Sequence, residues 1–444
     1  MTSKEENLSK EITSFIQERN ESFVKWRRTL HQIPETGWTE FQTTFFIGKQ
    51  LQSLGFTLTV GRDVLVSSER MGIPEQTVLS EHEQRAKKAG VPDEWLEKMI
   101  GGHTGLVASW DTGKKGPHIA LRFDIDALPI IESTESSHLP QESDFRSKHD
   151  GSMHACAHDG HAAIGLGTAH FIEKFQNQLE GKFTLLFQPA EEGSRGAKAM
   201  VEKGWLENVD YFISGHIGIH SLEIGDIAAT TSQFLATTKM NVTYDGQSAH
   251  AGVEPQKGKN ALLAAAAASL HLHGISRHSS GATRINVGKL EAGNGRNIIA
   301  DIGKIELETR GETTELNHYM VDEARRIIQS TAGLYDVNVD IQIVGDGLQA
   351  KCDEEWVRVV ELACAESPAI KRIIPELPLG ASEDVTYMMN RVQQKGGKAT
   401  FLLFGTPLAK GHHHPQFDFD ERVLAIAVET IGRLLFSCHN SDNL

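Results

Sequence analysis

The residues best suited to chemistry lie in the run Met153-His154-Ala155-Cys156-Ala157-His158-Asp159-Gly160-His161. In an extended segment, His154, Cys156 and His158 would point to one face. An imidazole beside a thiolate suits a borderline-soft divalent ion such as zinc. A buried thiol and a core histidine are the ordinary alternative, but the density of ligand-type side chains favours a metal. Because a metal needs three or four ligands, other segments must supply the rest.

Carboxylates follow two apolar segments. Glu191 and Glu192 come after residues 183–188 and Pro189. At a metal, one carboxylate can ligate while its neighbour accepts a proton from a bound water. Adjacent acids on a turn are as often solvated charges, so the pair alone leaves both interpretations open. Asp124 and Asp126 end another apolar segment and share a face, where they could cap a strand or orient a histidine.

A second histidine cluster, Gly411-His412-His413-His414-Pro415, lies near the other end of the chain. Purification tags are terminal and longer, so this internal triple favours a loop that carries a ligand. His216 ends an apolar segment and is uninformative by itself.

The elements that must position these residues follow from hydrophobic periodicity. Helices are predicted at residues 5–32, 39–54, about 75–100, 160–178, about 195–203, 258–276, 313–331, 353–366 and 418–435. Strands are predicted at 56–60, 106–110, 118–123, 183–188, 211–216, 239–244, 283–287, 303–310, 337–343 and 399–404. Alternating strands and helices predict an α/β domain with a mostly parallel sheet. The candidate residues recur just past strand ends, where open α/β sheets bind ligands.

A second domain is predicted at residues 231–346, inserted into a first domain of residues 1–230 and 347–444. Its β-α-β-β-α-β order is the ferredoxin-like arrangement. Ser248-Ala-His250 and Gly295-Arg-Asn297 lie in small-residue loops there, and Arg310 ends a strand. Turns and a surface charge are the simple explanation, but an arginine with an amide donor would also suit a bound carboxylate. Residues 62–103 form a polar excursion outside the predicted core.

Composition excludes several classes of function. The chain has 444 residues and a net charge of −15, and no basic stripe or basic amphipathic helix indicates nucleic acid or a membrane surface. No segment approaches the roughly 18 apolar residues of a membrane span. Four scattered cysteines and a polar N-terminus without a signal peptide favour a cytoplasmic protein.

Six stretches together resemble the amidohydrolase branch of the dizinc aminoacylase/carboxypeptidase family of metallopeptidases, in the family's order and across nearly the whole chain. They are Arg122-Phe-Asp-Ile-Asp-Ala-Leu-Pro129, His154-Ala-Cys-Ala-His-Asp-Gly-His161, Gln188-Pro-Ala-Glu-Glu-Gly193, Ser248-Ala-His-Ala251, Gly295-Arg-Asn-Ile-Ile299 and His413-His-Pro-Gln-Phe417. Others resemble a subgroup that hydrolyses aminobenzoyl-glutamate. They are Trp26-Arg-Arg28, Glu35-Thr-Gly-Trp38, Gly61-Arg-Asp-Val64, Ser68-Glu-Arg-Met-Gly72, Phe234-Leu-Ala-Thr-Thr-Lys239 and Ser382-Glu-Asp384.

The resemblance implies a catalytic domain with an inserted lid and dimerisation domain. It implies two divalent metal ions in each protomer, manganese or zinc, and a role for each matching residue. Glu191 would be the general base and Asp126 an orienter. His250, from a neighbouring protomer, would stabilise the oxyanion, and Asn297 and Arg310 would hold the substrate carboxylate. The implied metal ligands are Cys156, His158, Glu192, His216 and His413, with His412 as the alternative to His413.

The substrate implied is an N-aroyl or N-acyl acidic amino acid, p-aminobenzoyl-glutamate first, as in folate catabolism. The alternatives are an aryl-acetyl-aspartate conjugate and a non-catalytic role within a larger hydrolase. The partner would be a second copy or a related B-type chain. Asp124 stands where peptidase branches carry a ligand histidine, as is usual in this branch. One position departs from the family, because Ala157 replaces a glycine. If that glycine has positive φ, the alanine would strain the loop by roughly 1 kcal/mol or more.

Overall fold

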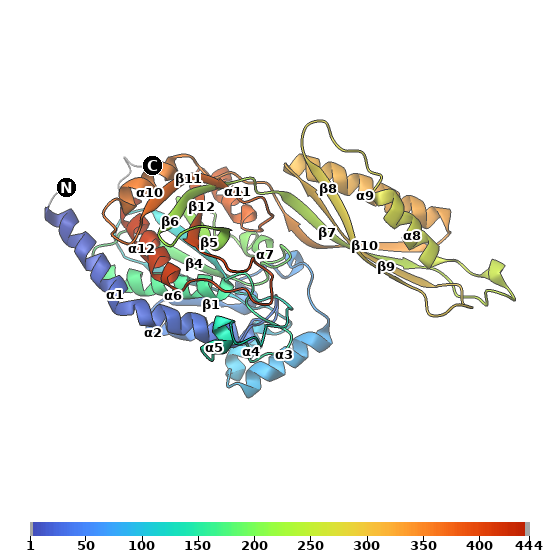
Figure 1. Ribbon diagram of the computed structural model, residues 1–444, viewed down its shortest axis with the longest axis horizontal. Coiled ribbons are helices and arrows are strands. Elements are labelled where there is room, and N and C mark those ends of the chain that lie inside the picture. Colours follow the sequence, from blue (N-terminus) through green and yellow to red (C-terminus); the bar gives the residue numbers. More distant parts are fainter. Residues whose placement is uncertain (1–2, 440–444) are drawn as a thin grey trace.

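The computed structural model describes residues 3–439, which form two separate β-sheets (Figure 1). The larger sheet has the strand order β1-β2-β4-β3-β5-β12-β6-β11. Its centre is parallel, because β3 pairs in parallel with β4 and β5, and β5 with β12. The strands are β1 Thr57–Val60, β2 Leu106–Asp111, β3 His118–Asp124, β4 Lys182–Gln188, β5 Tyr211–Ser221, β6 Asp226–Ser232, β11 Arg372–Pro378 and β12 Lys398–Thr406.

Helices cover both faces of this sheet. One layer comprises α1 Ser3–His31, α6 His158–Phe175, α10 Glu355–Cys364 and α12 Arg422–Ser437. The other face carries α7 Ala197–Val201 and α11 Thr386–Gln394. The central helix α6 is buried almost throughout and packs directly on β3 and β4. A Cβ at Gly165 would lie 2.6 Å from the Phe187 ring, so this glycine permits the close contact. The packing places the start of α6 at the carboxyl ends of the parallel strands.

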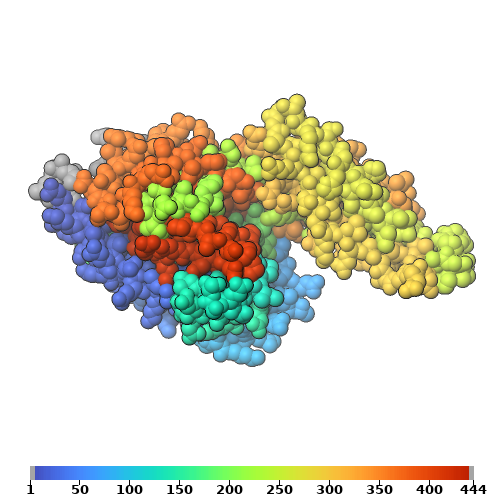
Figure 2. Space-filling model, viewed as in Figure 1, coloured from blue at the N-terminus to red at the C-terminus, as the bar shows by residue number. Residues whose placement is uncertain are grey.

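The smaller sheet is antiparallel, with the order β10-β7-β9-β8. Its elements are β7 Ala236–Asp245, α8 Ala261–Leu272, β8 Thr283–Ala292, β9 Ile302–Gly311, α9 Thr314–Leu334 and β10 Asn338–Gly347. Both helices pack on one face, where Met240, Val242 and Tyr244 are buried. Among residues 3–439, no helix covers the opposite face. Figure 2 shows this part of the chain, in yellow, as an arm projecting from the rest.

The predicted architecture is therefore confirmed: an α/β unit with a large sheet and a separate ferredoxin-like unit. The boundaries at residues 231 and 346 stay a prediction. No helix within residues 3–439 combines the length and apolar character that crossing a membrane requires.

Some predicted elements were wrong in detail. The single helix at 75–100 is two helices, α3 Gln76–Lys88 and α4 Asp93–Met99, because Gly90 has φ of 92° and Pro92 follows. Prediction also missed β6, β11 and α11. The remaining elements are α2 Phe41–Ser53, α5 Leu139–Glu142 and 3-10 turns at Gly61–Asp63, Ser67–Glu69 and Pro255–Lys257.

Candidate metal centre

Five segments converge at the carboxyl edge of the large sheet. β3 ends at Asp124, and β4 ends just before the turn that carries Glu191 and Glu192. His216 lies within β5, and Cys156 immediately precedes α6. The histidine loop after β12 closes the group, because the His413 N–H donates to the Ala155 carbonyl at 2.8 Å. Segments far apart in the sequence thus meet at one site.

Two sets of donor atoms fall within ligand distance of each other. One atom each of Cys156, His158 and Glu192 lies within 4.8 Å of the others, and so do atoms of Cys156, His216 and His412. His413 adjoins the first set, with its Nε2 3.5 Å from Glu192 Oε1. All of these residues except His158 line a cavity of about 420 Å³. A thiol, imidazoles and a carboxylate in this arrangement are a donor set for divalent transition metals.

Hydrogen bonds fix the orientation of three of the rings. His158 Nδ1 lies 3.0 Å from the Asp126 carbonyl, and His216 Nδ1 lies 2.8 Å from the Ile217 carbonyl, so each ring donates backward and leaves Nε2 for a ligand. His158 Nε2 is buried without a partner. His161 differs, because its Nδ1 lies 2.5 Å from Asp124 and its Nε2 accepts the Ile217 N–H. Both ring nitrogens of His161 are therefore hydrogen-bonded, so His161 stabilises the ends of β3 and β5 and leaves no nitrogen for a metal ion.

Asp126 connects the turn after β4 with a candidate ligand. One of its oxygens accepts the Glu191 N–H at 3.1 Å, and the other accepts the Glu192 N–H at 3.0 Å. The first oxygen also lies 3.3 Å from His158 Nδ1. This buried carboxylate therefore sets the direction of both glutamates and of the His158 ring.

Glu191 lies in a crowded acidic environment. Its carboxylate and those of Glu383 and Asp384 lie within 4.8 Å of one another. Burial, together with repulsion from Glu383 and Glu192, raises the pKa of Glu191 well above its ordinary value. The buried Arg122 guanidinium contacts both neighbours, at 3.4 Å from Glu383 and 3.2 Å from Asp384. A carboxylate with a raised pKa is suited to accept and return a proton.

The loops around the centre contain strained backbone. Five residues other than glycine have positive φ there, in a region that L-residues avoid at a cost of order 1–3 kcal/mol each. Ala157, at the position noted above, is one of them, with φ of 65°. The five are Ala157, Ala190, Ser194, Ile219 and His413.

The prediction that His154 shares a face with Cys156 and His158 was wrong. Ala157 is left-handed and α6 begins at His158, so extended alternation ends before the motif does. His154 is instead buried beside His31, with ring centroids 6.3 Å apart. Burial lowers its pKa to about 3.

The candidate residues of the inserted unit divide into two groups. Arg310 lines the cavity of the metal centre. His250 and Asn297 are exposed in the loops at the opposite end of the small sheet, about 30 Å away along β7 at the usual rise per residue. These loops contact each other, since Ala251 N–H donates to the Asn297 carbonyl. Within one chain they do not reach the cluster.

Lys239 is a cavity residue that the site prediction missed. It lies on the helix-free face of β7 and lines the same cavity as Glu191 and Arg310. Lys239 lies opposite Glu308 in the β7–β9 pair, and such a lysine–glutamate pair is usually an exposed surface ion pair. Two signals were available: Lys239 ends a stretch that resembles the aminobenzoyl-glutamate subgroup, and alternation along β7, with Met240 buried, indicated that Lys239 points away from the helices.

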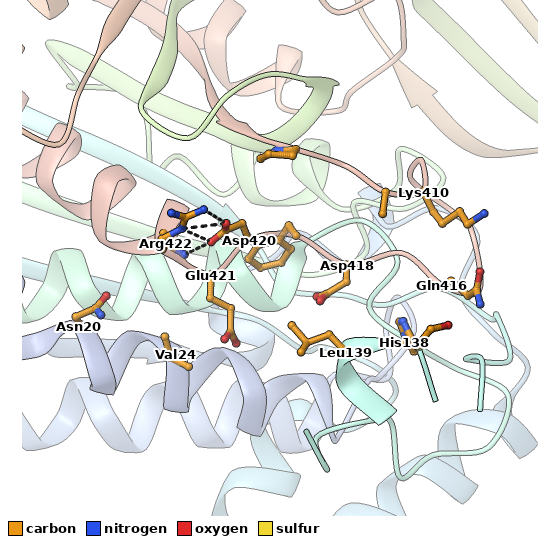
Figure 3. A pocket seen from close by; sticks show the side chains of 14 residues that line it. Asn20, Val24, His138, Leu139, Lys410, Gln416, Asp418, Asp420, Glu421 and Arg422 are labelled. Carbon is orange, nitrogen blue, oxygen red and sulfur yellow. Dashed lines mark hydrogen bonds and ion pairs between the residues drawn. The ribbon is translucent and has the colours of Figure 1, made fainter. Parts of the chain in front are cut away.

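A second cavity, of about 740 Å³, lies away from the cluster between α1, α5 and residues 407–422 (Figure 3). Its charged residues mostly pair among themselves or with α1. Arg422 binds Asp420, Asp418 binds Arg27 and Glu421 binds Arg28. These pairs neutralise most of the charges that line this cavity.

The comparisons with known proteins agree with this geometry. The model of peptidase family M20/M25/M40 matches residues 120–437. The chain belongs to this family. It is an amidohydrolase, and the family prediction is confirmed.

Relatives within the M20 family match over nearly their whole length. The indole-3-acetyl-aspartic acid hydrolase of Enterobacter agglomerans is 44% identical over 95% of this chain and 97% of its own. The A-type chain of p-aminobenzoyl-glutamate hydrolase from Escherichia coli is also 44% identical, with the same coverage. A solved structure, the aminobenzoyl-glutamate utilization protein from Klebsiella pneumoniae, has a TM-score of 0.83 and 38% identity over 96% of this chain and 98% of its own.

Proposed function

We propose that this M20 protein is a metal-dependent hydrolase that cleaves the amide bond of N-aroyl or N-acyl acidic amino acids. The favoured substrate is p-aminobenzoyl-glutamate, which would yield p-aminobenzoate and glutamate. The observation that carries the proposal is the ligand-type cluster beside a buried carboxylate, Glu191, in one cavity. The names of the two 44% identical relatives support the class of substrate.

The donor set fits two divalent ions. His158 Nε2 and Glu192 Oε1 are buried without a hydrogen-bond partner, as expected of atoms that face a cation. Nitrogen, sulfur and carboxylate donors accommodate zinc or manganese. The proposed ligands are Cys156, His158, Glu192, His216 and His413.

Each nearby residue then has a role in hydrolysis. The bound ions would acidify a water and polarise the amide carbonyl. Glu191 accepts the proton of that water and returns it to the leaving nitrogen, for which its raised pKa is suited. Asp126 holds His158 and the backbone of the glutamate pair in place. Arg310 binds the α-carboxylate of the amino acid product.

A second protomer completes the site in this proposal. His250 would stabilise the oxyanion and Asn297 would bind the substrate carboxylate, yet both are exposed and distant from their own chain's cluster. Their adjacent loops can deliver both side chains together to a neighbouring cavity. We favour a homodimer, and a related B-type chain is the alternative partner. The four cysteines are free thiols, which favours a cytoplasmic location.

An indole-3-acetyl-aspartate conjugate is the second candidate substrate, because that relative matches equally well. Steady-state kinetics of the purified chain on both compounds will rank them. A higher kcat/KM for p-aminobenzoyl-glutamate supports the favoured assignment, and a higher value for the aspartate conjugate replaces it. Hydrolysis of neither, with metal bound, would favour a non-catalytic role within a larger hydrolase.

A further inference from the structure

A third cavity opens directly beside the metal centre. It has a volume of about 600 Å³ and shares Glu192, Gly193 and Lys239 with the first cavity. A molecule held at the cluster can therefore extend into it. Three segments form its walls: residues 70–73 of the polar excursion, the turn after β4, and the helix-free face of the small sheet.

Three cations face this cavity without a carboxylate bound to them in the described part of the chain. Arg70 donates through Nη1 to the Gly101 carbonyl at 2.8 Å, and its Nε is buried without a partner. Burial lowers the pKa of Arg70 to about 10. Arg195 donates to backbone carbonyls, those of Glu192 and Gly72. Lys239 is half-buried and lies near enough to Glu191, Glu308 and Glu192 to be attracted by their carboxylates, but its ammonium group forms no ion pair within residues 3–439.

The charge around this cavity is opposite in sign to the net charge of the whole molecule. The chain carries a net charge of −15, yet these three half-buried cations form no ion pair within residues 3–439, and partial burial of a charge that no ion pair neutralises has a cost. Glu306, the acidic residue on the far wall, is exposed and already contacts Lys289. Glu192 borders the cavity but is committed to the metal centre in our proposal. Arg70, Arg195 and Lys239 thus leave a positive site next to the reacting bond.

Close backbone packing holds these walls together. A Cβ on Gly345 of β10 would lie 2.0 Å from the Gly193 carbonyl oxygen. One on Gly72, where φ is +55°, would lie 2.7 Å from the Val344 carbonyl oxygen. The excursion, the ligand turn and β10 therefore meet at van der Waals distance. Arg195 packs between the excursion and the ligand turn and donates hydrogen bonds to both, so the walls of the cavity are held in a fixed position.

We propose that this cavity binds the side-chain carboxylate of an acidic amino acid substrate, with Arg70 and Lys239 as donors and Arg195 as the supporting wall. Arginine suits this task because its guanidinium can bind a carboxylate with two hydrogen bonds. Arg310 then remains for the α-carboxylate. The inference rests on the proposed hydrolase function and names the residues that select glutamate or aspartate conjugates over neutral ones.

The test compares two substrates that differ only in this charge, p-aminobenzoyl-glutamate and its neutral isostere p-aminobenzoyl-glutamine. The readout is the ratio of their kcat/KM values. Wild-type protein should favour the acidic substrate. Arg70→Gln should lower the ratio by about 10- to 100-fold, the usual effect of losing a hydrogen bond to a charge, mainly through KM. Arg62→Gln, an exposed cation of the same excursion, is the matched control and should keep the ratio.

Bound metal is measured in every variant, and equal metal content separates a specificity defect from a damaged centre. If Arg70→Gln does not fold, Lys239→Gln provides the same test. A preference for glutamate that both variants retain would overturn the inference, as would a wild-type protein that hydrolyses both substrates equally. Either result leaves the proposed function standing. Wild-type protein that hydrolyses no N-acyl amino acid would instead refute the function itself.

Discussion

The Asp126 carboxylate accepts the backbone N–H of Glu192 at 3.0 Å. Its other oxygen accepts the N–H of Glu191 and approaches the His158 ring. A single buried side chain therefore aligns a proposed base and two proposed ligands that come from different segments. Chemistry at this centre depends on a residue that itself need not touch the substrate.

Replacing Asp126 with asparagine should weaken metal binding. An asparagine keeps one acceptor oxygen and turns an NH₂ group toward one of the glutamate N–H groups. Loss of such a supporting contact typically lowers metal affinity about 10- to 100-fold. Chelator competition measures that affinity. Asp111→Asn, at an exposed strand end, is the control and should bind metal as wild type does. Unchanged affinity in Asp126→Asn would refute the role of Asp126.

The first two histidines of the triple, His412 and His413, should behave differently. His412 Nε2 already accepts the Ile219 N–H at 3.0 Å, which leaves only Nδ1 free. His413 Nε2 lies 3.5 Å from Glu192 Oε1, and the neighbouring Cys156 and Glu192 raise the pKa of His413 to about 10. We expect His413→Ala to lower the bound metal from two ions to one and His412→Ala to retain both. Elemental analysis of the purified variants decides, and the reverse pattern would assign the ligand to His412.

Ala157→Gly should change stability little, because two effects offset each other. Relief of the left-handed conformation gains about 1–2 kcal/mol, while loss of a buried methyl costs about 0.8 kcal/mol. Ala162→Gly within α6 is the matched control. It should lose about 2 kcal/mol, since the methyl and about 1 kcal/mol of helix propensity are both lost. Denaturant midpoints measure both variants. Equal losses would contradict the strain at Ala157.

Because of His31, the free energy of unfolding should fall as the pH becomes alkaline. Burial alone would lower its pKa, but hydrogen bonds to Asp159 at 2.8 Å and Glu132 at 2.9 Å raise the pKa of His31 to about 9. The charged ring therefore contributes fully below its ordinary pKa of about 6.5, and the contribution is lost as pH rises through about 9. The expected loss is on the order of 1–3 kcal/mol.

Unfolding free energies of wild-type protein and His31→Gln at pH 6.5 and pH 9.5 test this expectation. The variant should be less stable at pH 6.5 and lose less on going to pH 9.5. His271→Gln, an exposed histidine on α8, serves as the control. Parallel pH profiles for wild type and His31→Gln would contradict the prediction.

Periodicity predicted the long elements of the fold because α1, α6 and α9 carry regular apolar patterns. It missed β6 and β11, since β6 is rich in alanine and threonine and β11 is largely exposed. Local sequence cannot show that a sheet will recruit such segments. Gly90 and Pro92 could have predicted the break between α3 and α4, since glycine often ends a helix and proline begins one.

Only part of the candidate site could be predicted from short sequence motifs. Cys156, His158 and the glutamate pair lie in short motifs, so spacing indicated them. The prediction for His154 was wrong, because Ala157 is left-handed and α6 begins at His158, so the segment is not extended through to His158. Arg70 and Lys239 belong to stretches that resemble the aminobenzoyl-glutamate subgroup, but neither could be assigned a role in the site from the sequence, because tertiary packing alone brings the excursion and the small sheet to the same cavity.

The most direct test is release of free glutamate from p-aminobenzoyl-glutamate by the purified chain, before and after chelation and after addition of manganese or zinc. Glu191→Gln is run in parallel with its bound metal measured. We predict hydrolysis that chelator abolishes, that added metal restores, and that Glu191→Gln lacks despite retaining metal. Glutamate release that survives complete metal removal, or an active Glu191→Gln variant, would contradict the proposed mechanism.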